Sequence, residues 1–385
     1  MSNFISSKLR FRSSLATWAI GISFFIMIIS LAVSAGFRVE IRRGVSSLTG
    51  DIQLSSVHQN WYSENDPIHS QPSYIDKIVS AKGVTSVSPA VFRAGIVKSS
   101  NGIHGVLFKG SEEADTASMS VSVPSKLAEE MKIGVGDKMM TYFVGEKVKI
   151  RNFTVSSIYE SILDSDESQI VHVPFADMQR LNGWEGDQAS CIEIKVDDAH
   201  KSTAALKELS GELGGISLMY SNEEEDPLIA SSSAERYRQL FDWLDLIDFN
   251  VLAILTLMII VAGFNMISGL LIMLFRNIPT IGTLKALGMT DRGIEKVFLR
   301  VASGTVLKGM AFGNAAALLF CLVQGLTHMI KLNPENYFVS FVPVHVTVWQ
   351  LIGVNAIAYA AIMLLLLIPC MFISKVDPAE TMRVQ

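Results

Sequence analysis

Apolar residues along this chain are concentrated in a few long stretches that are separated by polar sequence. A helix needs about 20 apolar residues to cross about 30 Å of hydrocarbon, and four stretches are long enough. We therefore predict four membrane-spanning helices and a polar remainder that folds outside the membrane. The predicted spans are residues 15–33, 247–275, 301–326 and 349–373.

The first apolar stretch has an alternative interpretation as a secretory signal peptide. Lys8, Arg10 and Arg12 precede it, and Val33-Ser34-Ala35 resembles a cleavage site made of small residues. Its apolar core of about 19 residues is, however, longer than the roughly 7 to 15 residues usual in signal peptides. We interpret it as a membrane anchor.

The orientation follows from the basic residues beside the spans, because Lys and Arg accumulate on the cytoplasmic side. Lys and Arg are frequent in residues 1–14, in the loop 276–300 and in the tail 374–385, whereas the loop 331–346 contains Lys331 alone. Both termini are therefore predicted to be cytoplasmic.

This orientation places a large domain on the outer side, between the first two spans. Arg38, Arg42 and Arg43 depart from the charge rule, as they would if the first helix continues beyond the membrane. The predicted order is a cytoplasmic amino terminus with the first span (1–37), the external domain (38–246), the second span (247–275), a cytoplasmic loop (276–300), the third span (301–330), a short external loop (331–346), the fourth span (347–373) and a cytoplasmic tail (374–385).

Charge separates the external segment from the rest. Residues 38–245 contain 20 Lys and Arg against 31 Asp and Glu, a net charge of −11, whereas the whole chain carries −5. An acidic exterior argues against nucleic acid or anionic lipid as the partner of this domain. Cys191 is the only cysteine in the segment, which excludes an intramolecular disulfide there.

Both ends of the external segment show the pattern of strands next to helices. Residues 51–57 are extended and apolar, and a short helix is predicted at 72–80 before the β-rich run 84–106. At the other end, a strand at 191–196 precedes the cap Asp197-Asp198 and a helix at 200–209. We predict one α/β module built from residues of about 50–105 and 187–230.

Between these two ends the chain mostly alternates apolar and polar residues. The alternation covers residues 123–181 and is interrupted by Gly134, Gly136 and Gly145, as expected for strands joined by turns. This pattern predicts a second, β-rich module of about residues 106–186 that is inserted into the first.

Two further patterns concern the helices. Apolar residues recur with helical period over residues 231–247, which predicts a helix that continues into the second span. The third span contains Gly309 and Gly313 in GxxxG spacing, which lets a neighbouring helix approach closely.

Motifs of catalysis are missing from the sequence. Residues 304–309 come nearest to a phosphate-binding loop but lack its lysine at the required place, and there is no H-E-x-x-H or G-x-S-x-G motif. The seven histidines are scattered, so we predict no metal site. The chain is therefore expected not to be an enzyme and to bind no cofactor itself.

The cytoplasmic loop contains a short helical pattern. Pro279 and Gly288 bound a helix predicted at 280–287, with Ile281, Leu284 and Leu287 on one side. A positively charged connector would explain the basic residues of the loop. It would not explain an apolar helix face in water, which indicates that a partner covers it.

This loop resembles the coupling helix "(E)IGxLKALG" of FtsX/MacB-type ABC transporter permeases, which lies in a groove of a separate ATPase subunit. Thr280 stands where those permeases commonly have an acidic residue. The resemblance implies that the loop contacts the ATPase through Ile278, Thr280, Ile281, Gly282, Leu284, Lys285, Ala286, Leu287 and Gly288.

Other segments extend the resemblance along the chain and are similar to the lipoprotein-releasing (LolC/LolE-like) branch. The Asn-Pro-x-x-Tyr to Val-Pro-Val loop and the Asp-Pro-Ala-Glu tail are the parts typical of that branch. The matching segments are 36–52, 134–137, 265–267, 333–344 and 369–383.

The resemblance implies a fold and partners. The fold would be an α-helical membrane protein with four transmembrane helices and a large α+β periplasmic domain, consisting of a porter-like module with an inserted β-rich Sabre-like module. Two permease chains, identical or paralogous, would assemble with two ATPase subunits in the bacterial inner membrane. ATP and Mg would be bound through those ATPase subunits.

For a lipoprotein-releasing permease, the cargo is a lipoprotein that a periplasmic carrier accepts. Exposing its acyl chains to water would cost about 0.8 kcal/mol for each CH₂, so an apolar cavity is needed. Lipid contact and helix packing are the alternative roles of the residues that we expect to line the cavity. These are Phe24, Phe25, Met27, Ile28, Leu31, Leu252, Leu255, Met258 and Ile259.

The segment 159–171 is expected to be an exposed acidic hairpin. In lipoprotein-releasing permeases a loop in this region can recruit the carrier, and Asp164, Asp166 and Glu167 would attract a basic partner. An ordinary solvated turn is the alternative interpretation.

Two other functions are compatible with the family. One is an FtsX-like signalling subunit that controls a periplasmic cell-wall hydrolase, although such proteins usually have a much smaller external domain. The other is a MacB-like efflux permease, although those usually carry the ATPase on the same chain.

Overall fold

The computed structural model describes residues 14–58, 66–99, 102–112, 117–145, 147–161, 169–184, 186–222 and 225–370. They form two compact units. The helical unit lies within Met1–Arg38, Leu244–Lys331 and Val342–Gln385, and the outer unit comprises Val39–Trp243 and Leu332–Phe341.

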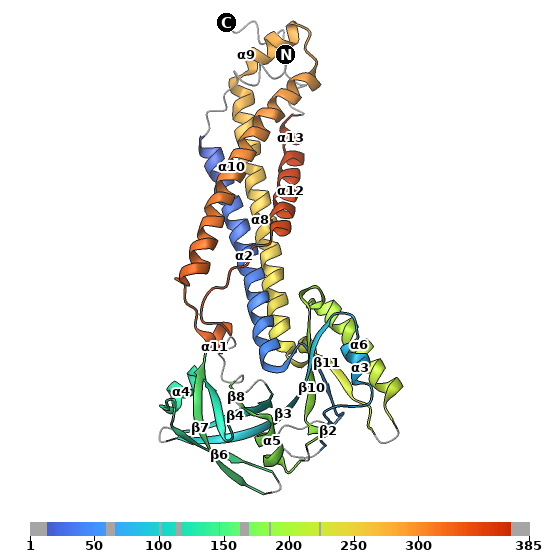
Figure 1. Cartoon of the computed structure of the whole chain (residues 1–385). Helices are drawn as coiled ribbons and strands as arrows, with labels where there is room; N and C mark the ends of the chain where they lie inside the picture. Colours follow the sequence, from blue (N-terminus) through green and yellow to red (C-terminus); the bar gives the residue numbers. More distant parts are fainter. Residues whose placement is uncertain are drawn as a thin grey trace. The chain divides into compact units, whose positions relative to one another are not determined.

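Four helices among the described residues are long and apolar enough to cross a membrane. They confirm the four predicted spans, and they lie side by side in Figure 1. The helices are α2 (Ser14–Thr49), α8 (Arg238–Arg276), α10 (Asp291–Thr327) and α12 (Val348–Leu365), which α13 (Leu367–Cys370) extends.

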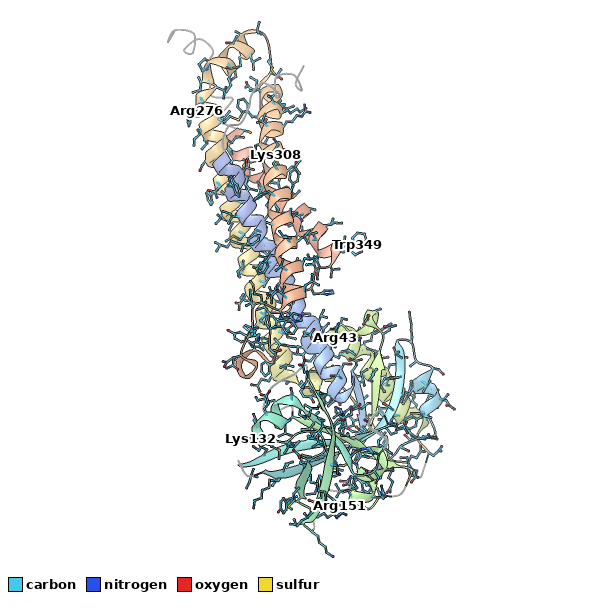
Figure 2. All side chains as sticks on the ribbon, turned by 60° about the vertical axis from the view of Figure 1, so that its left-hand side comes forward. Arg43, Lys132, Arg151, Arg276, Lys308 and Trp349 are labelled. Atoms are coloured by element: carbon cyan, nitrogen blue, oxygen red, sulfur yellow. The ribbon has the colours of Figure 1, made fainter. Side chains whose placement is uncertain are left out.

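The helices of this unit share an apolar core. On α8 the buried positions Ala262, Met266 and Leu270 recur every four residues, which is the spacing of one helix face. Phe24 of α2 and Phe298 of α10 pack into the same core. Trp349, at the start of α12, instead points away from the bundle with 81% of its surface exposed (Figure 2).

One half of the outer unit is an antiparallel sheet covered by two helices. The strand order is β11 (Ile229–Ser232), β1 (Ile52–Ser55), β10 (Cys191–Val196) and the first part of β3 (Val84–Ser99). Helices α3 (Ile75–Val79) and α6 (Thr203–Tyr220) pack their apolar residues against Ile52, Leu54, Ile192 and Ile194.

The other half of the outer unit is a closed barrel of six strands. The second part of β3 pairs with β4 (Gly102–Ser111), and the order continues through β8 (Ile170–Pro174), β5 (Ser120–Pro124), β7 (Lys149–Tyr159) and β6 (Lys138–Phe143) back to β3. Closure removes the exposed strand edges that an open sheet would have. Helices α4 (Ser125–Met131) and α5 (Phe175–Asn182) add Leu127 and Met178 to the barrel core.

Strand β3 joins the two halves, because residues 84–90 pair with β10 and residues 91–99 pair within the barrel. The β-rich module predicted from alternation is thus this barrel, and the predicted division at residue 105 falls inside β4. The remaining short elements are β2 (Ile68–His69), β9 (Gln188–Ala189), η2 (Asp198–His200), α7 (Ser233–Arg236) and α11 (Pro334–Tyr337).

The prediction of one helix from residue 231 into the second span is wrong in detail. Residues up to Ser232 belong to strand β11. Ser232 and Glu235 then form a capping box that starts α7, and Tyr237 interrupts the helix before α8 begins at Arg238. The apolar period could not show this break, because it begins at Tyr237 itself and residues 231–236 contain no large apolar side chain.

Candidate functional site

The predicted cytoplasmic helix is present as α9 (Ile278–Ala286), with Pro279 in its first turn. Gly288 ends the turn that follows, at a φ of 84° that favours glycine. The adjoining helix α10 is capped by the side chain of Thr290, which accepts a hydrogen bond from Gly293. Lys285 and Asp291 form an ion pair of 2.9 Å that ties α9 to α10.

The prediction that Ile281, Leu284 and Leu287 form an apolar face outside any core is wrong for two of them. Ile281 is buried in the core of the helical bundle, and Leu284 packs against the same core. Leu287 is 79% exposed, beyond the last residue of α9. The bundle core therefore buries part of the apolar face that was predicted to contact a partner protein.

The other residues predicted to contact the ATPase are likewise partly buried and partly exposed. Gly282 is buried, and Ile278 and Lys285 are half-buried. The residues open to a partner are Thr280, Ala286, Leu287 and Gly288. A coupling contact would therefore centre on the end of α9 and the turn that follows.

Gly309 and Gly313 lie where α10 meets α2. A Cβ atom at Gly309 would stand 2.7 Å from Ile20, and one at Gly313 would collide with the backbone oxygen of Gly21. Only residues without a side chain allow the two helix backbones to come this close.

The predicted cavity residues of α2 lie mostly inside the chain's own bundle. Phe24 and Met27 belong to the bundle core, and Ile28 is 1% exposed. The prediction that these three line a cavity between two permeases is therefore wrong for this structure. Phe25 and Leu31 are half-buried.

On α8 the predicted cavity residues are divided. Leu255, Met258 and Ile259 pack against the bundle core, whereas Leu252 is 60% exposed. The exposed apolar face of α8 has other members, which the sequence could not single out because periodicity does not tell inner from outer apolar residues. They are Leu246, Phe249, Leu257, Ile260 and Phe264.

An ion cluster joins α2 to α8 in the helical unit. Arg38 pairs with Asp245 at 3.1 Å and also with Asp248, which accepts a hydrogen bond from Ser34. This cluster gives Arg38, which departs from the basic-residue rule, two carboxylate partners. The departure from the rule was the only sign of the cluster in the sequence.

Two of the segments that resemble the permease family, around Gly36 and around Pro343, contact each other in the helical unit. A Cβ atom at Gly36 of α2 would collide with the backbone of Pro343, and the amide of His345 donates to the carbonyl of Ala32 at 2.9 Å. Gln324 of α10 holds the segment from the other side, because its amide donates to the carbonyl of Val342 at 3.1 Å.

Replacing Gly36 by Ala is expected to lower the stability of the helical unit by about 1 to 3 kcal/mol, because the new methyl group overpacks the Pro343 contact. Gly304→Ala is the matched control, since open space surrounds that position of α10 and alanine favours a helix by up to about 1 kcal/mol. Thermal unfolding of both purified variants would measure the difference. Equal melting temperatures would contradict the close contact.

Buried cations hold the end of α2 in the outer unit. The Lys109 amine of β4 donates to the carbonyl of Leu48 and to Glu193 of β10, both at 2.8 Å. The Arg236 guanidinium donates to the carbonyls of Thr49, at 3.1 Å, and Gly50, at 3.2 Å. Cations at a helix carboxyl end are favourable because the last carbonyls carry partial negative charge.

Burial raises the pKa of Glu193, and the neighbouring Lys109 opposes that shift. Burial likewise lowers the pKa of Arg236. The sequence gives no sign of this group, because its members come from β4, β10 and α7 and meet only in the folded domain.

The acidic residues Asp164, Asp166 and Glu167 lie outside the described residues, as do the tail segment 376–383 and residues 371–373 of the predicted fourth span. Among the described residues, no cluster of three or more His, Cys, Asp or Glu is arranged to hold a metal ion.

Four helices long and apolar enough to cross a membrane, together with a large folded domain, are the features of a membrane permease. Residues 13–212 match the model of the MacB-like periplasmic core domain, and residues 252–378 match that of the FtsX-like permease C-terminal domain. The chain belongs to this FtsX/MacB family of ABC transporter permeases. Proteins of this family are transporter components.

Curated relatives cover nearly the whole chain. The chain is 21% identical to the "Lipoprotein-releasing system transmembrane protein LolC" of Xylella fastidiosa (strain Temecula1), over 95% of this chain and 91% of the relative. It is also 21% identical to the corresponding protein LolE of Haemophilus influenzae, over 94% of this chain and 92% of the relative.

A solved structure is similar to part of the chain. The periplasmic region of MacB from Actinobacillus actinomycetemcomitans aligns with a TM-score of 0.31 and 14% identity, covering 51% of this chain and 94% of that one.

Proposed function

We propose that this chain is the permease subunit of an ABC transporter that extracts lipoproteins from the outer leaflet of the bacterial inner membrane and delivers them to a periplasmic carrier. The similarity to lipoprotein-releasing permeases over nearly the whole chain carries this proposal. Two copies, or one copy and a paralogue, would assemble with two separate ATPase subunits, which bind ATP and Mg.

Helix continuity supports a mechanical role. Residues 14–38 of α2 belong to the helical unit and residues 39–49 to the outer unit, and α8 likewise contributes to both. ATP-driven movement at α9 would thus reach the external domain through two unbroken helices. We propose that the α/β half is the porter-like module and that the barrel is the Sabre-like module.

The exposed face of α8 is the surface that we propose for the acyl chains. Phe249, Ile260 and Phe264 are 68%, 43% and 65% exposed on one side of that helix. Each acyl CH₂ kept out of water saves about 0.8 kcal/mol, so an apolar helix face shared by two permeases would retain the cargo.

The test is release of a triacylated lipoprotein from spheroplasts that contain this permease and its ATPase. We expect ATP-dependent transfer of the lipoprotein to a soluble carrier and a photo-crosslink from residue 260 to the cargo. A cargo whose lipid-bearing Cys is replaced by Ala is the matched control and should neither crosslink nor be released. Absence of release, together with altered cell-wall hydrolase activity, would instead identify a signalling subunit.

A further inference from the structure

Strands of a closed barrel normally point apolar side chains inward and polar side chains outward. The inward set follows this rule, because Val97, Met139, Phe143 and Phe153 are buried in the barrel core. Several outward positions of β3, β4, β6 and β7 depart from it by carrying large apolar side chains. Four of these side chains are 39 to 69% exposed and lie near one another: Ile96, Ile103, Met140 and Ile150.

The strand register gathers these side chains into two neighbouring rows. Ile96 pairs with Tyr142 of β6, which pairs with Ile150 of β7. In the next outward row, Lys98 pairs with both Ile103 and Met140. Side chains at paired positions lie about 4.5 to 5.5 Å apart, so the two rows form one surface. We call it the barrel patch: Ile96, Lys98, Ile103, Met140, Tyr142 and Ile150 (strands in Figure 1).

The barrel patch is basic, although residues 38–245 as a whole carry a net charge of −11. Lys98 lies within the patch, and Lys138 is the next outward residue of β6 beyond Met140. Neither lysine forms an ion pair with another residue that the structure describes. The described outward positions of β3, β6 and β7 include no Asp or Glu.

We propose that the barrel patch is a docking surface for a separate protein that presents aliphatic side chains surrounded by carboxylates. Exposed apolar patches on soluble surfaces mark interaction sites, and the two unpaired lysines select an acidic partner. This inference does not depend on the cargo of the transporter, because it uses only the barrel.

The charge and shape of the patch argue against two other occupants. A second copy of the chain that met the patch face to face would bring the lysines of the two patches into one acid-free interface, which is repulsive. A lipid surface is usually entered by a protruding amphipathic helix, whereas these side chains lie in the middle of barrel strands.

The test uses the full-length chain in intact cells, with the photo-reactive residue benzoylphenylalanine in place of Ile150. The matched control places it at Ser157, which is exposed on the same strand but lies beside the polar Ser122, 2.6 Å between their hydroxyl oxygens. We expect a crosslink from position 150 to a peptide rich in Asp or Glu with aliphatic residues, and none from position 157.

Charge variants decide whether the lysines select this partner. Lys98→Glu with Lys138→Glu should lower the crosslink yield at least about tenfold, whereas Lys98→Arg with Lys138→Arg should preserve it. Barrel folding is checked by equal protease resistance of both variants. The proposal is overturned if position 150 crosslinks to lipid, to another copy of this chain or to nothing, or if the yield does not depend on charge.

Discussion

Replacing Leu287 by Asp is expected to weaken binding of the ATPase subunit at least about 30-fold while the chain still folds and inserts into the membrane. Leu287 is 79% exposed and makes no contribution to the bundle core. An apolar anchor that fills a partner's groove commonly contributes about 2 kcal/mol or more to binding. Aspartate would place an unpaired charge in that groove, which adds a desolvation cost.

Co-purification of the ATPase and ATP hydrolysis by the complex would measure this effect. Leu218→Asp is the matched control, because Leu218 is 71% exposed in the outer unit and should leave assembly unchanged. Leu284→Asp would not separate lost ATPase binding from lost stability of the permease. Leu284 packs against the bundle core, so its loss would also destabilise the chain. Wild-type amounts of bound ATPase with Leu287→Asp would refute the coupling role of α9.

Replacing Lys109 by Met is expected to destabilise the outer unit by about 3 to 5 kcal/mol, because it leaves Glu193 as a buried charge without its main partner. Lys109 and Glu193 are only 5% and 4% exposed, and their charged groups lie 2.8 Å apart. The carbonyl of Leu48 would lose its donor at the same time.

The double variant Lys109→Met with Glu193→Met should recover most of this loss, because apolar residues of similar size often replace a buried ion pair at little cost. Lys201→Met is the matched control, since its ion pair with Asp198 is exposed and should contribute little. Thermal unfolding of the purified full-length variants measures each change. A single Lys109→Met variant as stable as the Lys201→Met variant would show that the buried pair does not support the fold.

Helix α9 was predictable from the sequence only in part. Pro279 and Gly288 correctly predicted a short helix between α8 and α10, because proline and glycine act on the backbone locally. The helical period also grouped Ile281 with Leu287. It could not show that the bundle core buries Ile281 and leaves Leu287 exposed, since both are apolar residues at compatible spacing.

The sequence by itself determined the four spans and their order, because the length of an apolar stretch is a property of neighbouring residues and the membrane sets the length required. It likewise predicted a β-rich insertion, because alternation has a period of two along each strand.

Only the tertiary structure decided which distant segments meet. Three contacts are examples. The pairing of β3 with β6 closes the barrel, Gly36 lies against Pro343, and Lys109 pairs with Glu193, which is 84 residues further along the chain. Such contacts depend on strand register and on the direction in which each backbone returns. The apolar period of a sequence predicts neither the register nor the direction. Many registers bury the same number of apolar residues and differ only in which side chains become neighbours.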